Sequence, residues 1–97
     1  MKYAAVLYYE ARPNSEVVYQ VALIFPDLRD AGFASYHTVG SSREDVLDAS
    51  KEILGLAVKE AAERGLTLPD GTPILKINVD HGHETHPFRI IVENISI

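Results

Sequence analysis

The sequence contains no cysteine, no tryptophan and no apolar run long enough to cross a membrane. Without cysteine the chain can form neither disulfides nor thiolate metal sites, and it has no thiol nucleophile. A transmembrane helix needs roughly 20 apolar residues. The hydrophobic start of the chain carries tyrosines and lacks the small-residue cleavage site of a secretory signal. We therefore expect a cytoplasmic protein with no membrane association.

Basic residues are also scarce, since nine Lys and Arg stand against fourteen Asp and Glu and give a formal net charge of −5. This balance argues against long-range attraction to nucleic acid phosphates. A chain of 97 residues is long enough for one hydrophobic core and too short for two. We expect a single domain, residues 1–97, that more readily meets a basic partner than an acidic one.

Hydrophobic periodicity predicts an α+β fold with the element order β-β-β-α-β-β. The five strands are expected at residues 2–10, 16–25, 33–39, 75–79 and 88–97. The long helix begins near Ser41, which forms a capping box with Glu44. Ser42 with Asp45 is the alternative register, and Gly65 ends the helix. Short links between the first three strands predict an antiparallel meander on which the helix packs.

Five pieces of sequence follow one another in a characteristic order. They are the aromatic run Tyr3 to Tyr9, then Phe25-Pro26-Asp27-Leu28, Gly40-Ser41-Ser42-Arg43-Glu44-Asp45, Ala49, and Gly65-Leu66-Thr67-Leu68-Pro69. In this order and spacing they resemble the HicB-like antitoxin domain, and the resemblance covers residues 1–73. It implies a partial RNase H-like core of antiparallel strands with one packed helix. It also implies a non-catalytic antitoxin, without a cofactor, whose partner is a small basic toxin that cleaves messenger RNA.

The chain departs from the family pattern in two places. Arg29-Asp30-Ala31-Gly32 stands where family members have Pro-Gly-Cys, next to the stretch where a partner would dock. Full-length members usually add a C-terminal DNA-binding domain, whereas residues 74–97 are predicted to form two extra strands. We therefore expect a stand-alone HicB-like domain that does not bind operator DNA.

The stretch from Phe25 to Gly32 has two interpretations. Pro26 has no N–H and cannot sit in a central ladder, so the strand ends there. Asp27 can accept hydrogen bonds from amides downstream of it. The first interpretation is a structural turn that seats Phe25 and Leu28 in the core. The second is a loop whose side chains form a partner-binding surface, namely Phe25, Asp27, Leu28 and Arg29.

Catalysis is not expected. Two-metal nucleases need converging carboxylates, usually including one on the first strand, and here that strand offers only Glu10 at its end. Three of the four histidines, His81, His83 and His86, fall within six residues. Imidazole is a good zinc ligand, and their spacing resembles the H-x-H-x-D-H signature of metallo-β-lactamase-type hydrolases. Thr85 replaces the Asp of that signature, so a solvated turn is the preferred interpretation and a metal-dependent hydrolase the distant alternative.

Aromatic side chains on the sheet offer a second alternative, because single-stranded RNA bases stack on aromatic platforms. The candidate contacts are Tyr8, Tyr19 and Tyr36. Strand alternation sends about half of the aromatic residues into the core, and the basic residues are scattered, so packing is the better interpretation of each tyrosine.

The last predicted strand is apolar on both faces, which exposed edge strands avoid. Pairing with a second copy across a two-fold axis would cover it. We therefore expect a homodimer that uses Ile91, Ile95 and Ile97.

Overall fold

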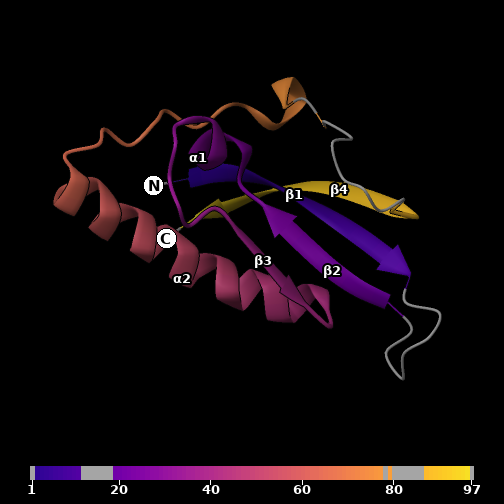
Figure 1. Ribbon diagram of the computed structural model, residues 1–97. Coiled ribbons are helices and arrows are strands. Elements are labelled where there is room, and N and C mark those ends of the chain that lie inside the picture. Colours follow the sequence, from indigo (N-terminus) through magenta and orange to yellow (C-terminus); the bar gives the residue numbers. More distant parts are fainter. Residues whose placement is uncertain (1, 12–18, 78, 80–86, 97) are drawn as a thin grey trace.

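The aromatic-rich start of the chain becomes the centre of a four-stranded antiparallel sheet with one long helix packed against it (Figure 1). The computed structural model describes residues 2–11, 19–77, 79 and 87–96. The strands run in the order β3-β2-β1-β4. Their bounds are Lys2–Ala11 for β1, Tyr19–Ile24 for β2, His37–Gly40 for β3 and Arg89–Ser96 for β4. The helices are α1, Pro26–Asp30, and α2, Arg43–Arg64, followed by a short 3-10 turn η1, Ile74–Lys76. The α+β class and the antiparallel meander are confirmed.

Strand β1 is central because both of its edges are paired. It pairs with β2 from Val6↔Ile24 to Ala11↔Tyr19 and with β4 from Lys2↔Ser96 to Tyr9↔Arg89. Every β1 residue between its two ends is buried. A strand buried on both faces needs an unbroken apolar sequence rather than an alternating one, which accounts for the run of Tyr, Ala, Val and Leu at the start of the chain.

The sheet has two covered faces. We call the face packed against α2 the helix face. Its buried strand residues are Tyr3, Ala5, Leu7, Tyr9, Val21, Leu23 and Ile95. On the opposite face a smaller cluster contains Val6, Tyr8 and Ala22, with Ile24, Ile77, Val79, Ile90 and Val92 packed against it. Two apolar faces on one sheet require covering material on both sides.

Helix α2 begins and ends at the predicted positions. Ser42 is the N-cap, and its Oγ accepts a hydrogen bond from the N–H of Asp45 at 3.2 Å. The alternative capping register is therefore confirmed, and the one that starts at Ser41 is wrong. Gly65 ends the helix in a left-handed conformation, φ 67°, and the N–H of Leu66 donates back to a carbonyl in the last turn. Among the described residues, no helix is long and apolar enough to cross a membrane.

The predicted fourth strand is wrong. Residues Ile74–Lys76 form the 3-10 turn η1 after Pro73. This part of the chain does not join the sheet but crosses its opposite face. Ile77 and Val79 pack on that face, while Leu75 is 97% exposed. Apolar and polar residues do alternate here, but the segment covers the opposite face of the sheet and does not form a strand.

The chain between β2 and β3 is also more structured than predicted. Helix α1 starts with Pro26 at its first helical position, where the missing N–H has no partner to lose. It ends at Asp30 with Ala31 as C-cap, Gly32 follows with a φ of 86°, and the N–H of Phe33 donates to the carbonyl oxygen of Leu28 at 3.0 Å. The third strand is consequently shorter than expected, His37–Gly40.

Candidate partner-binding site

Residues 66–77, which we call the strap, lead from the end of α2 past the start of β1 to the opposite face of the sheet (Figure 1). The hydroxyl of Tyr3 donates to the carbonyl oxygen of Pro69 at 2.5 Å. At Gly71 the strap passes so close to β1 that a Cβ there would lie 2.4 Å from the carbonyl oxygen of Lys2. These two contacts hold the strap against the first residues of β1.

A third contact joins the strap to α1. The carboxylate of Asp27 accepts from the N–H of Thr72 at 2.8 Å and from its hydroxyl at 2.7 Å. Asp27 therefore acts on a segment 45 positions away in the sequence, not on the amides that follow it. The Asx-turn explanation of Asp27 is replaced by a long-range link.

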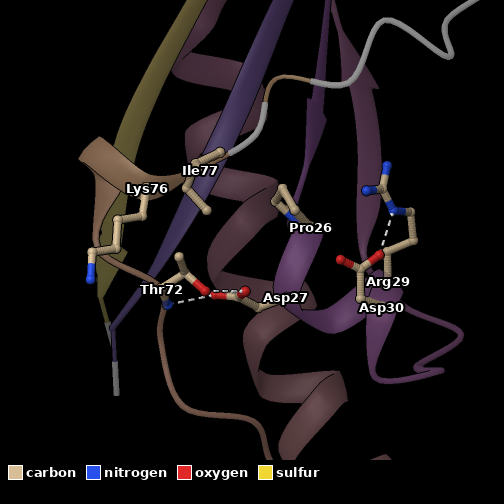
Figure 2. A pocket seen from close by; sticks show the side chains of 7 residues that line it. All are labelled: Pro26, Asp27, Arg29, Asp30, Thr72, Lys76 and Ile77. Atoms are coloured by element: carbon tan, nitrogen blue, oxygen red, sulfur yellow. Dashed lines mark hydrogen bonds and ion pairs between the residues drawn. The ribbon is translucent and has the colours of Figure 1, made fainter.

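A polar groove of about 360 Å³ lies where the strap passes α1 (Figure 2). Its lining is contributed by both segments and consists of Pro26, Asp27, Arg29, Asp30, Thr72, Lys76 and Ile77. Arg29 and Asp30 pair at 3.2 Å at the α1 edge. The ammonium group of Lys76 comes from the strap side. The groove thus presents charges of both signs on a fixed frame, which suits polar recognition of a partner rather than enclosure of an apolar ligand.

The four predicted partner-binding residues separate into two pairs. Phe25 and Leu28 are fully buried and pack in the core beneath α2, which confirms the structural turn as the interpretation of these two side chains. Asp27 and Arg29 are half-buried and line the groove. The prediction of a partner surface therefore rests on Asp27 and Arg29.

Burial raises the pKa of the Tyr3 hydroxyl, and the negative charges of Asp27 and Asp70 raise it further. Tyr3 thus stays protonated over the neutral range and keeps donating to the strap carbonyl. The carboxylate of Asp27, which lines the groove, therefore also favours the donor that holds the strap.

We expect replacement of Asp27 by alanine to lower the free energy of unfolding by about 1–3 kcal/mol, because two hydrogen bonds to a charged group are lost. Urea unfolding would measure the change. Amide hydrogen exchange at Thr72 should become faster in the same variant. The matched control is Asp30→Ala, which removes an exposed carboxylate with a surface ion pair and should cost less than about 0.5 kcal/mol. Equal effects of the two substitutions would contradict the link.

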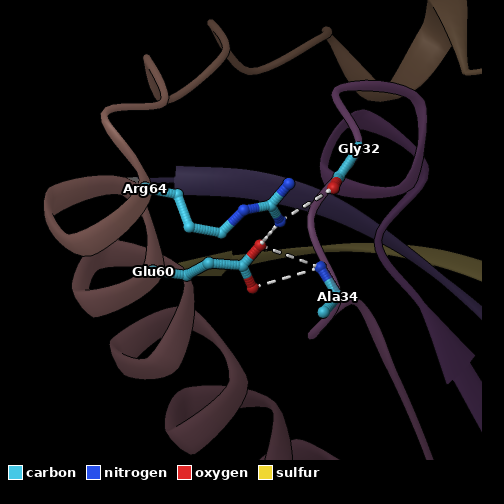
Figure 3. A network of polar contacts seen from close by, with 4 residues as sticks. All are labelled: Gly32, Ala34, Glu60 and Arg64. Atoms are coloured by element: carbon cyan, nitrogen blue, oxygen red, sulfur yellow. Dashed lines mark hydrogen bonds and ion pairs between the residues drawn. The ribbon is translucent and has the colours of Figure 1, made fainter.

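A separate polar network fixes the loop between α1 and β3 (Figure 3). Both carboxylate oxygens of Glu60 accept from the N–H of Ala34 at 3.1 Å. Arg64 donates to Glu60 and, at 3.5 Å, to the carbonyl oxygen of Gly32. The hydrogen bond from the N–H of Ala34 is the largest influence on the pKa of Glu60 and lowers it; desolvation opposes this, and the hydrogen bond and charge of Arg64 lower the pKa further. The contact therefore contributes to stability above pH 4.5 and is lost as the pH falls through the lowered pKa.

The three tyrosines predicted to contact RNA do not form one platform. Tyr8 is buried on the opposite face of the sheet. Tyr19 packs on the helix-face core, with its ring centroid 5.9 Å from that of Tyr9. Tyr36 lies outside the strands and its ring contacts that of His37. Successive bases could not stack on side chains that are divided between two faces, so the RNA alternative gains nothing from the geometry.

Two of the three side chains predicted to dimerise, Ile91 and Ile95, pack in the core of the helix face. Ile95 is 7% exposed, and Ile91 is half-buried against the same cluster. Ile97 lies outside the described residues, as do His81, His83 and His86. The metal interpretation of the histidines thus stays a prediction. Within the described ranges, no group of three or more His, Asp and Glu side chains is placed to hold a metal ion.

Helix α2 carries a row of acidic residues that was not predicted from the sequence as a binding surface. Glu44, Asp48 and Glu52 are all exposed and follow one another at intervals of four residues, so they share one side of the helix. The next position in the row is Leu56, which is 51% exposed. Like charges at this spacing destabilise an isolated helix. The spacing alone could have revealed the row; the apolar residue at its end needed the structure.

No protein-family profile and no curated protein matches the chain. A similar fold occurs in a chain of a solved toxin–antitoxin complex from Streptococcus pneumoniae. The TM-score is 0.69 at 22% sequence identity, and the match covers 98% of this chain and 67% of that chain. At this level of identity the likeness establishes the fold, which is thus one that occurs in a toxin–antitoxin assembly.

Proposed function

We propose that this chain is a HicB-like, non-catalytic antitoxin with a partial RNase H-like core, which neutralises a small basic RNA-acting toxin. The observation that carries the proposal is the fold shared over nearly the whole chain with a component of a toxin–antitoxin complex. The order of sequence motifs from Tyr3 to Pro69 supports the same assignment independently. No single motif would be specific enough alone.

The charge distribution supports a basic partner. The chain has a net charge of −5, and the acidic row of α2 presents Glu44, Asp48 and Glu52 to solvent with Leu56 at its end. A charged row beside an exposed apolar side chain provides both steering and a contact that excludes water. We assign the row as the surface that first meets the toxin. The groove with Asp27 and Arg29 is the second, more polar contact.

The test begins with capture from a native lysate by the tagged chain, read by intact-mass spectrometry and by the 260/280 nm absorbance ratio. A small basic protein at stoichiometric level is then purified and assayed for cleavage of messenger RNA. We expect cleavage to stop when this chain is added at equal concentration. Recovery of nuclease-sensitive nucleic acid alone, or of a partner whose activity the chain does not inhibit, would overturn the proposal.

Reversing charges in the acidic row of α2 tests whether the row is the surface that binds the toxin. The variant Asp48→Lys/Glu52→Lys should raise the Kd for the captured protein by about 10- to 100-fold at low salt, mainly through slower association. The matched control, Glu63→Lys/Asp70→Lys, makes the same change in net charge at exposed positions outside the row and should change the Kd less than about threefold. If both variants weaken binding equally, only net charge matters and the row is not the docking surface.

A further inference from the structure

In the part of the chain that the structure describes, strand β4 has an open edge. It pairs on one side with β1 along its whole length of eight residues, and no strand lies on its other side among residues 2–11, 19–77, 79 and 87–96. Natural edge strands are usually short or interrupted by proline or a bulge. The other edge strand, β3, is short, with four residues. By contrast β4 is long, contains no proline, and leaves alternate N–H and C=O groups pointing outward.

The sequence of β4 is self-complementary when it is read against itself. We propose that β4 pairs antiparallel with β4 of a second copy of this chain, about a two-fold axis at Ile91. In this register Arg89 lies opposite the partner's Glu93, and Glu93 lies opposite the partner's Arg89. On the other face of the sheet Ile90 lies opposite the partner's Val92. From position 89 to position 93 each cross-strand pair therefore joins either opposite charges or two apolar side chains, which favours the antiparallel pairing.

Neighbouring registers lack this match. An axis at Glu93 places the two Glu93 carboxylates opposite each other. An axis at Val92 sets Glu93 against the partner's Ile91, and an axis at Ile90 sets Arg89 against the partner's Ile91. Like charges or a charge facing an aliphatic side chain disfavour these pairings. The charges thus select a single register as well as the partner.

Both charged groups can take part. Arg89 is exposed, and its guanidinium lies 5.8 Å from the ring centroid of Tyr9. Glu93 already accepts from Arg43, with the Nε to Oε2 distance at 2.8 Å. A carboxylate has about four acceptor positions, so Glu93 can hold Arg43 and still accept from the partner's Arg89.

An exposed apolar side chain near one end of β4 is consistent with the same pairing. Leu75 is 97% exposed and lines a hollow together with Asn94. A second copy paired along the open edge of β4 would lie beside this hollow and reduce the exposure of Leu75 to water. Phe88, just before the strand, takes no part in the pairing, because its ring lies 6.2 Å from those of Tyr9 and Tyr19 on the helix face.

Sedimentation of the purified chain at micromolar concentration tests the pairing without any toxin, so its outcome is independent of the proposed function. We expect a dimer for the natural sequence. Arg89→Glu and Glu93→Arg, each alone, place like charges opposite each other twice per dimer and should raise the dissociation constant on the order of tenfold or more. An equimolar mixture of the two variants restores both opposite-charge pairs, and a heterodimer should form.

The matched controls are Lys59→Glu and Glu63→Arg, which make the same charge changes on exposed positions of α2 and should leave the dimer unchanged. Circular dichroism checks folding. If Glu93→Arg fails to fold because Arg43 loses its partner, Arg43→Glu/Glu93→Arg restores the internal pair and takes its place in the mixture. A monomeric natural chain, or a mixture that stays monomeric, would overturn the proposal.

A single cysteine gives a direct reading of the register, because the chain has none of its own. Residues on a two-fold axis face their own copies. Under mild oxidation Ile91→Cys should form a disulfide-linked dimer, while Asn94→Cys, which faces a different residue of the partner, should not. Cross-linking at 94 and not at 91 would contradict the register.

Discussion

Replacing Phe25 with alanine is expected to lower the free energy of unfolding by about 3–5 kcal/mol. Phe25 is fully buried in the core between the sheet and α2, so the substitution removes the transfer free energy of the ring and leaves a cavity. A domain of this size has a total stability of about 5–15 kcal/mol, and the variant is therefore close to unfolding at 37 °C. Chemical unfolding followed by circular dichroism measures the change.

The conservative variant Phe25→Leu is the control, and it should cost about 1 kcal/mol because most of the apolar volume is kept. If Phe25→Ala instead kept its stability and lost binding to the captured partner, Phe25 would belong to the docking surface and the structural turn would be the wrong interpretation.

Replacing Gly71 with alanine is expected to destabilise the chain by about 1–3 kcal/mol, or more if the strap cannot shift. The new Cβ would lie 2.4 Å from the carbonyl oxygen of Lys2, and a backbone atom of the central strand cannot move away as a flexible side chain can. The strap would then have to lift from β1, which weakens the contacts at Tyr3 and Asp27. Thermal and urea unfolding measure the loss, and amide exchange at Thr72 reports whether the strap lifts.

Gly55 provides a matched control, because it lies on the exposed side of α2 and a Cβ there meets nothing within 4 Å. Gly55→Ala should stabilise the chain by about 0.5–1 kcal/mol, since alanine is the better helix former. The same chemical change is thus expected to have opposite signs at two positions. Destabilisation by both variants, or by neither, would show that the close approach at Gly71 does not limit stability.

Local signals predicted the parts of the fold that depend on local physics. Helix α2 has a capping residue, a periodic apolar side and a terminal glycine. Each of these signals depends on interactions between residues that are close together in the sequence. The choice between Ser41 and Ser42 as N-cap remained open in the sequence because both have an acidic residue three positions on. The structure decides it in favour of Ser42, whose backbone is extended and whose side chain accepts from the N–H of Asp45.

Long-range contacts explain what the sequence did not predict. Asp27 and Thr72 are 45 positions apart, and nothing in either neighbourhood shows that they meet. The alternating residues near Leu75 satisfied the rule for a strand, but the rule cannot tell whether such a segment pairs with a sheet edge or packs across a sheet face. Likewise, the apolar character of β4 was evident from the sequence. The register with β1 determines that Ile91 and Ile95 point to the helix face of the sheet.

The pairing of β1 with β4 also bears on the order in which the chain folds during synthesis. Lys2 pairs with Ser96, so the central strand is made first while one of its two neighbours is made long after it. Until then one edge of β1 has only water beside it, although the strand is apolar on both faces. Non-local pairing of this kind folds slowly and leaves the nascent chain open to association. We expect the protein to depend on prompt completion of its C-terminal part, with stalled chains being the species that aggregate.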